Sequence, residues 1–97
     1  MSTSIIVAGR LYVDPAVRDE YVADCLSVIE QARAASGCLD FVLSSDPIES
    51  SRINVYERWE SDAHLEQFRG AGPEPDQAAK IHDARVVKYR ISSSEAP

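Results

Sequence analysis

The pattern of apolar and polar positions along the chain predicts four strands. Period-two alternation and β-branched residues mark them, and we expect strands at residues 4–13, 38–45, 52–60 and 84–91. Residues 46–51 have turn-forming chemistry, so the second and third strands are expected to form a hairpin. One of the two faces of the first strand is strongly apolar and carries Ile5, Val7, Leu11 and Val13.

Apolar side chains at three- and four-residue spacing predict a long helix after the first strand. Asp14 is a good N-cap, Pro15 is tolerated at the first helical position, and the helix is expected to run to about Ser36. Gly37 follows as the left-handed residue that ends it. The buried stripe is expected to consist of Val17, Tyr21, Cys25, Val28, Ile29 and Ala32.

A second helix is predicted directly after the third strand, from Asp62 to about Arg69. Ser61 is its expected N-cap, and Asp62 complements the helix dipole in the first turn. Leu65 and Phe68 are expected to point to the core.

The segment after this helix contains its own breaks. Glycine and proline within residues 70–75 end the helix, and a short helical piece is expected from Asp76 to about His82. We assign residues 1–91 to one domain and the small, polar residues 92–97 to a flexible tail.

The predicted order is β-α-β-β-α-β, which indicates an α+β, ferredoxin-like fold. We expect a four-stranded antiparallel sheet with its helices on one face. The other face then carries amphipathic side chains such as Tyr12 and Tyr56 and remains uncovered. A second copy of the chain, related by two-fold symmetry, is the expected partner for that face.

Composition narrows the function classes. The 97 residues carry 16 acidic and 10 basic side chains, a formal charge of −6, which disfavours nucleic acid and an anionic membrane as partners. The longest apolar run is Ile5 to Ala8, and no signal peptide is recognisable, so we expect a cytoplasmic protein. Cys25 and Cys38 are expected to be reduced thiols.

Residues 56–65, Tyr-Glu-Arg-Trp-Glu-Ser-Asp-Ala-His-Leu, resemble the signature of the antibiotic biosynthesis monooxygenase (ABM) domain family. In that family a strand ends in Glu-x-Trp-x-Ser and a helix begins at once. A Gly-Cys pair that opens the second strand, here Gly37-Cys38, is also typical, as are small residues at the end of the preceding helix, here 31–36. The resemblance extends from about Ile5 to Ile91.

The resemblance implies a homodimer in which two sheets pack face to face into an α+β barrel, with a pocket between sheet and helices in each protomer. Some members oxidise polycyclic phenols or hydroquinones with O₂ and no cofactor, while others act on quinones, degrade haem or have no assigned activity. Many members carry a histidine nine residues after the tryptophan, where this chain has Phe68. Haem-degrading members use an asparagine on the first strand, and this chain has none before Asn54.

We therefore expect no cofactor and no metal site, and a small aromatic compound as substrate or ligand. Glu57 and Trp59 share a strand face and are the candidate catalytic residues. Burial would disfavour the charged form of a carboxylate there and make Glu57 a plausible base for a phenol or a C–H acid. The candidate substrate-binding residues are Tyr21, Phe41, His64, Phe68 and Tyr89.

Three functions remain open at this point. The first is a cofactor-independent monooxygenase for a phenolic, polyketide-like or quinol substrate. The second is a non-catalytic dimeric barrel that binds a small hydrophobic ligand or has a stress-related or regulatory role. In that case Glu57 pairs with an arginine or caps a backbone group, and Trp59 is a core residue. The third is a proton-transfer enzyme with Glu57 as base.

Overall fold

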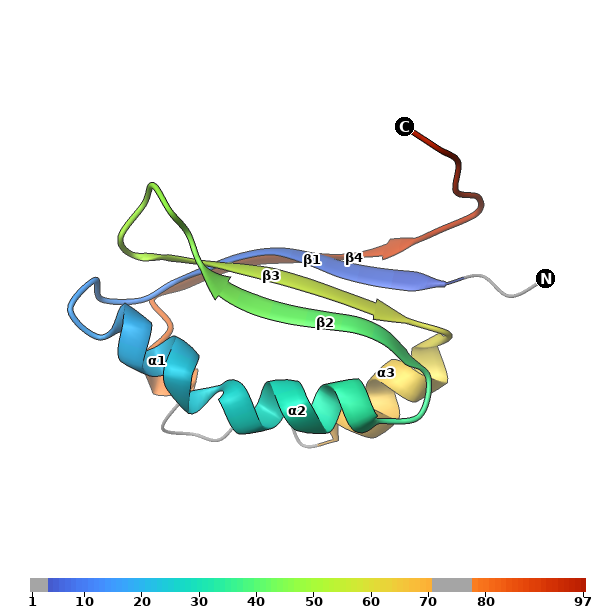
Figure 1. Ribbon diagram of the computed structural model, residues 1–97, viewed down its shortest axis with the longest axis horizontal. Coiled ribbons are helices and arrows are strands. Elements are labelled where there is room, and N and C mark those ends of the chain that lie inside the picture. Colours follow the sequence, from blue (N-terminus) through green and yellow to red (C-terminus); the bar gives the residue numbers. More distant parts are fainter. Residues whose placement is uncertain (1–3, 71–77) are drawn as a thin grey trace.

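The computed structural model describes residues 4–70 and 78–97 and has two layers, a sheet and the helices on one of its faces (Figure 1). The strands are β1 (Ile5–Tyr12), β2 (Cys38–Ser45), β3 (Arg52–Trp59) and β4 (Asp83–Arg90). The helices are α1 (Arg18–Asp24), α2 (Leu26–Ala34) and α3 (Asp62–Arg69).

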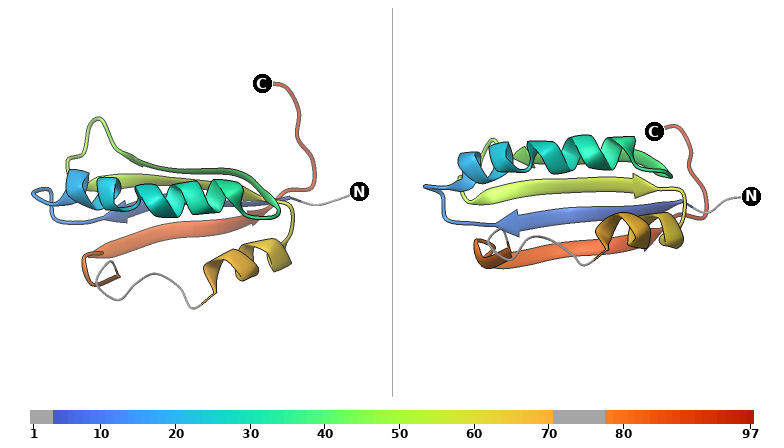
Figure 2. Two further views of the ribbon diagram at one scale, coloured as in Figure 1. Left: turned by 60° about the horizontal axis from the view of Figure 1, so that its bottom comes forward. Right: turned by 90° about the horizontal axis from the view of Figure 1, so that it is seen from below.

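The sheet has the strand order β2-β3-β1-β4, and every neighbouring pair is antiparallel. Helices α1 and α2 run along the β2 side of the sheet, and α3 lies toward β4 (Figure 2). The α+β, ferredoxin-like fold predicted from the order of elements is confirmed. None of the helices within residues 4–70 and 78–97 is long and apolar enough to span a membrane.

The register of β3 positions the candidate site. Glu57 lies opposite Val7 on β1 and Phe41 on β2, while Trp59 lies opposite Ile5 and Cys38. Alternate residues of β3 are buried, as period two requires for a strand with one face against helices. Glu57 and Trp59 lie side by side on one face of β3, as their spacing predicts, and the structure shows that this is the buried face, under the helical layer.

The core consists of two clusters along the length of the sheet. Trp59 belongs to the cluster that also contains Ile5, Val7, Ile29, Ala32, Phe41 and Leu65. The other cluster contains Val13, Tyr21, Cys25 and Ile53. The buried side chains predicted for one helix are thus divided between the two clusters, with Ile29 and Ala32 in the first and Tyr21 and Cys25 in the second.

The long helix predicted from Asp14 to Ser36 is wrong as a single element, because it is interrupted at Cys25. The Cys25 N–H lies 3.1 Å from the carbonyl oxygens of both Tyr21 and Val22, so it is shared between α-type and 3₁₀-type bonds. Ile29 N–H then donates to the Cys25 carbonyl at 2.9 Å, and α2 continues after a bend relative to α1 (Figure 1).

The start of this helical region also differs from the prediction. The Asp14 carboxylate accepts from Ala16 N–H at 2.8 Å, and the Asp14 carbonyl accepts from Val17 N–H at 3.0 Å, so residues 14–17 form a turn. Val28 was predicted to be buried and is instead 40% exposed, because the buried positions of α2 are Ile29 and Ala32.

The predicted ends of the four strands and of α3 agree with the structure within one residue. Gly37 has the expected left-handed conformation, with φ +80°, but α2 already ends at Ala34 with Ala35 as an extended C-cap, so Gly37 lies in the turn before β2 and does not end the helix. Ser61 accepts from His64 N–H at 3.2 Å as the N-cap of α3. Ala78 and Ala79 are helical and His82 is not, while the expected start of that piece at Asp76, with residues 71–75, lies outside the described residues. Residues 92–97 are exposed and extend away from the sheet (Figure 1).

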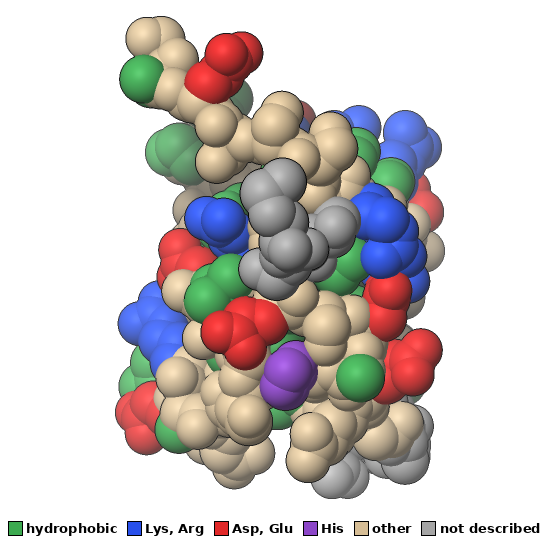
Figure 3. All heavy atoms as spheres, turned by 90° about the vertical axis from the view of Figure 1, so that its right-hand side faces the viewer, with side chains coloured by type: hydrophobic (Ala, Val, Ile, Leu, Met, Phe, Trp, Pro, Cys, Tyr) green, Lys and Arg blue, Asp and Glu red, His purple; other side chains and the backbone are tan. Residues whose placement is uncertain are grey.

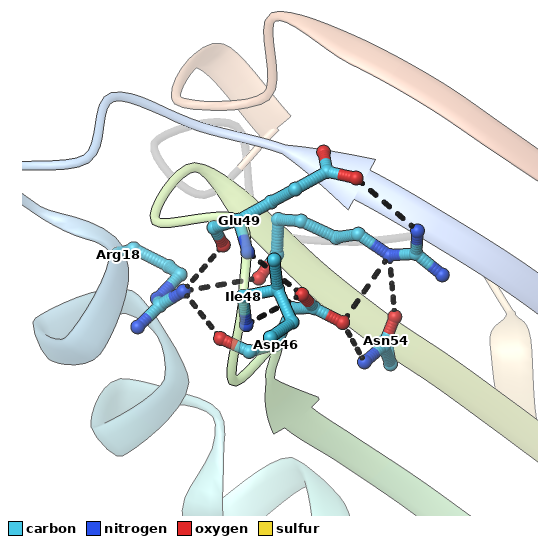
Figure 4. A network of polar contacts seen from close by, with 6 residues as sticks. Arg18, Asp46, Ile48, Glu49 and Asn54 are labelled. Carbon is cyan, nitrogen blue, oxygen red and sulfur yellow. Dashed lines mark hydrogen bonds and ion pairs between the residues drawn. The ribbon is translucent and has the colours of Figure 1, made fainter.

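A polar network fixes the hairpin between β2 and β3 (Figure 4). Arg18 at the start of α1 donates to the carbonyls of Asp46 and Glu49 at 3.0 and 2.8 Å. The Asp46 carboxylate accepts from the Glu49 and Ile48 N–H groups and from the Asn54 side chain. These hydrogen bonds lower the pKa of Asp46 to about 2.

Candidate active site

The site is centred on a buried carboxylate. Glu57 is 6% exposed, and its Oε1 accepts a hydrogen bond from the indole Nε1–H of Trp59 at 3.0 Å. Trp59 itself is 0% exposed. A buried indole donor needs an acceptor, and here the acceptor is the carboxylate two residues away on the same strand face.

Arg69, in the last turn of α3, is the second partner of Glu57. Its Nη2 lies 3.3 Å from Oε2 and 3.4 Å from Oε1 of Glu57. The Arg69 side chain is 49% exposed, whereas that of Glu57 is 8% exposed. The ion pair therefore joins a buried anion to a cation that reaches solvent.

Two phenylalanine rings complete an aromatic cluster around Trp59. The Phe68 ring lies 5.3 Å from the indole with an interplanar angle of 32°. Phe41 meets Phe68 edge to face, with 5.9 Å between centroids and 66° between planes. Both arrangements are within the favourable range for aromatic pairs.

A groove between the end of α2 and α3 leads to this cluster. It has a volume of about 380 Å³ and is lined by Gln31, Ala35, Ser36, His64, Gln67 and Phe68. Phe68 belongs both to this lining and to the cluster, so its ring separates the groove from Trp59. Figure 3 shows the end of the molecule where α2 and α3 meet, with a histidine side chain at the surface.

His64 lies at the edge of the groove, and its orientation is fixed. Its Nδ1 is 2.7 Å from the hydroxyl oxygen of Ser61. The ring also packs against Gly37, where a Cβ atom would overlap its Cγ and Cδ2. Gly37, in the turn between α2 and β2, is thus required both by its backbone conformation and by the neighbouring imidazole.

Two predicted binding residues lie elsewhere. Tyr21 is buried in the second core cluster with Cys25, and burial raises its pKa. Tyr89 pairs with Ile6 and is 50% exposed on the open face of the sheet. The structure therefore brings together Glu57, Trp59, Phe41 and Phe68, with His64 at the edge, and leaves Tyr21 and Tyr89 outside this group.

Sequence reasoning missed Arg69. An arginine partner for Glu57 was one of the expected possibilities, but the sequence did not identify which arginine, and the structure shows that it is Arg69 on α3 of the same chain. A basic residue at the end of a helix that follows a buried acid was the available signal.

A second hollow of about 440 Å³, lined by Arg33, Cys38, Leu39 and Asp40, lies outside the aromatic cluster.

The described residues offer few other chemical groups. Within residues 4–70 and 78–97, no three or more His, Cys, Asp or Glu side chains are grouped to hold a metal ion. Cys25 and Cys38 are thiols not joined by a disulfide, and burial raises the pKa of both. The chemistry of the site is thus that of one carboxylate, one guanidinium and three aromatic rings.

Solved structures share this fold over nearly the whole chain. One is a "putative antibiotic biosynthesis monooxygenase" from Caulobacter crescentus, 22% identical, with a TM-score of 0.75 over 97% of this chain and 92% of that one. Another is a protein from Bacteroides thetaiotaomicron described as a "possible oxidoreductase", 10% identical, with a TM-score of 0.78 over 94% and 100% of the chains. At these identities the likeness establishes the fold alone.

Sequence comparison supplies the family. A curated relative, the uncharacterised protein sll1783 of Synechocystis sp., is 31% identical over 94% of this chain. The chain spans 65% of the length of that relative. The pattern of the antibiotic biosynthesis monooxygenase family matches residues 4–84, and the chain belongs to this family.

Proposed function

We propose that the protein is a cofactor-independent monooxygenase that oxidises a small aromatic substrate, phenolic, polyketide-like or quinol, with O₂. The observation that carries the proposal is the buried Glu57 carboxylate beside an aromatic cluster that adjoins an open groove. Membership of the family supports the reaction class.

The ring of the substrate enters by the groove and displaces Phe68 from its contact with Trp59. Phe68 is in the groove lining and its ring touches the indole. A planar ligand that takes the place of the Phe68 ring is enclosed by Trp59 and Phe41 and is shielded from water.

The chemistry begins with a proton transfer. Glu57 accepts a proton from the ring hydroxyl, or from a methylene group activated by the ring, and leaves an electron-rich anion. That anion gives an electron to O₂, and the two radicals combine at carbon. In the overall reaction a CH₂ group becomes C=O, one oxygen atom enters the product and the other leaves as water, which balances atoms and electrons.

The test is O₂ consumption by purified, chelator-treated protein with anthrones, naphthols and hydroquinones. Glu57→Gln keeps the shape and the acceptor for the indole but cannot take the proton, so uptake is expected to fall by about 100-fold or more. Glu60→Gln, on the exposed neighbour, is the matched control and keeps full uptake. Equal uptake by the wild-type protein and Glu57→Gln contradicts the proposal.

A second candidate, non-catalytic binding of a small aromatic ligand, is favoured by the contact between Glu57 and Arg69. A carboxylate with an indole and a guanidinium partner is also what a purely structural ion pair contains. Saturable binding of the aromatic panel by a folded protein that consumes no O₂ supports this candidate instead.

We also propose that a second copy covers the open face of the sheet. Val87 and Tyr89 are each 50% exposed there, and the Nε atoms of Arg10 and Arg58 on the same face are buried without a hydrogen-bond partner. Sedimentation equilibrium is expected to give twice the chain mass, and Val87→Glu to shift it to the monomer. A monomeric wild-type protein contradicts this arrangement.

A further inference from the structure

We propose that Arg69 is the anion-binding residue of this site, and that the site selects aromatic compounds with an ionisable hydroxyl group, which it holds as their anions. The inference rests on the proposed function for the place of the ring beside Phe68 and Trp59. It adds the residue that binds the hydroxyl oxygen of such a substrate and the charge state in which the site holds it.

The contact between Arg69 and Glu57 is loose for an ion pair. A single nitrogen, Nη2, makes both contacts, at 3.3 and 3.4 Å, whereas bonds between charged groups are usually about 2.7–2.9 Å long. Asp62 on the same helix has tighter contacts, at 2.8 Å to Arg90 and 2.9 Å to Lys88. The Arg69 guanidinium therefore keeps donors that a ligand can use.

The position of Arg69 suits a ligand that arrives from solvent. Its side chain is 49% exposed and follows directly after Phe68, the residue that lines the groove. The Phe68 ring packs on Trp59, the Trp59 indole donates to Glu57, and Glu57 contacts Arg69. We therefore place the hydroxyl group of a ring that replaces the Phe68 side chain near both Glu57 and Arg69.

The charges then balance within the site. When the ligand O–H bond breaks, its proton goes to an oxygen of Glu57 and its electron pair stays on the ligand oxygen. Glu57 becomes neutral, the ligand becomes an anion, and Arg69 exchanges one anionic partner for the other. No uncompensated charge is left in the buried site, where it would be strongly unfavourable.

A ring without an ionisable hydroxyl gains nothing from this exchange. It leaves the contact between Arg69 and Glu57 as it is, and only its apolar area contributes to binding. Discrimination between a naphthol and its methyl ether therefore measures the proposed role of Arg69.

The experiment is an absorbance titration in O₂-free buffer with 4-nitro-1-naphthol, whose anion absorbs at longer wavelength than the neutral form, and with its methyl ether. Arg69→Gln is expected to weaken binding of the naphthol by about tenfold or more and that of the ether by less than about twofold. Arg69→Lys keeps the charge and restores part of the affinity. Arg90→Gln, which removes an exposed arginine from an ion pair with Asp62, is the matched control and changes neither affinity.

Glu57→Gln is expected to have the opposite effect on affinity from Arg69→Gln. It removes the carboxylate that competes for Arg69 and keeps an oxygen for the Trp59 indole, so the preformed naphtholate at alkaline pH is expected to bind more tightly than to the wild-type protein. A structural ion pair predicts instead that both substitutions weaken the naphthol and the ether alike. That result, or a wild-type protein that does not bind the naphthol, overturns the inference. Because no O₂ is present, the binding result can be interpreted even if the protein proves not to be an oxygenase.

Discussion

Replacement of Glu57 by alanine tests whether the carboxylate organises the core around Trp59. The substitution leaves the buried indole N–H without its acceptor, which costs about 1–3 kcal/mol. Loss of one buried methylene adds about 0.8 kcal/mol, and loss of the contact with half-exposed Arg69 adds about 0–1 kcal/mol. The free energy of unfolding is therefore expected to fall by about 2–5 kcal/mol.

The assay is urea unfolding followed by fluorescence, because Trp59 is the only tryptophan and reports directly on the site. Glu57→Gln keeps an oxygen for the indole and is expected to cost only about 0–1 kcal/mol. Glu60→Ala, on the exposed neighbouring residue, is the control for loss of a surface charge. If Glu57→Ala costs no more than Glu60→Ala, the hydrogen bond between Trp59 and Glu57 does not hold the core in the way argued above.

Three further predictions concern the surroundings of the site. Gly37→Ala should lower the free energy of unfolding by about 2–4 kcal/mol, measured in urea, because the added Cβ overlaps His64. Gly70→Ala, which also has a positive φ but open space around it, should lower it by about 1–2 kcal/mol, and equal losses for the two variants refute the contact between Gly37 and His64. The pKa of Asp46 is about 2 in the folded protein and 3.8 in the unfolded chain, so its carboxylate stabilises the fold at pH values above 3.8, and this contribution is lost as the pH falls through about 2. The difference in unfolding free energy between the wild-type protein and Asp46→Asn should therefore shrink between pH 3.8 and about 2, and a constant difference contradicts the prediction. Phe68→Ala should expose Trp59 to acrylamide quenching, and unchanged quenching would show that the ring does not separate the indole from the groove.

The sequence was most informative where the relevant geometry is local. Side chains alternate along a strand whatever it packs against, so the spacing of Glu57 and Trp59 was enough to place them on one face of β3. That this face lies under the helices follows from the structure. The positive φ of Gly37 and the cap at Ser61 are likewise properties of a few adjacent residues.

The remaining errors concern geometry that local patterns do not contain. Helical periodicity identified Tyr21 as buried, but it could not tell which of the two core clusters it joins. The interruption at Cys25 has no glycine or proline to signal it. The contact of Arg69 with Glu57 depends on where the end of α3 crosses the sheet, which only the assembled fold determines.

The most direct test of the central claim is a reaction under ¹⁸O₂ in ordinary water, with the aromatic compound that gives the fastest O₂ uptake, followed by mass spectrometry of the product. A monooxygenase of the kind proposed incorporates one ¹⁸O atom into each product molecule, and Glu57→Gln forms little of this product under the same conditions. Product that contains oxygen from water alone, or equal labelling by the wild-type protein and Glu57→Gln, contradicts the account.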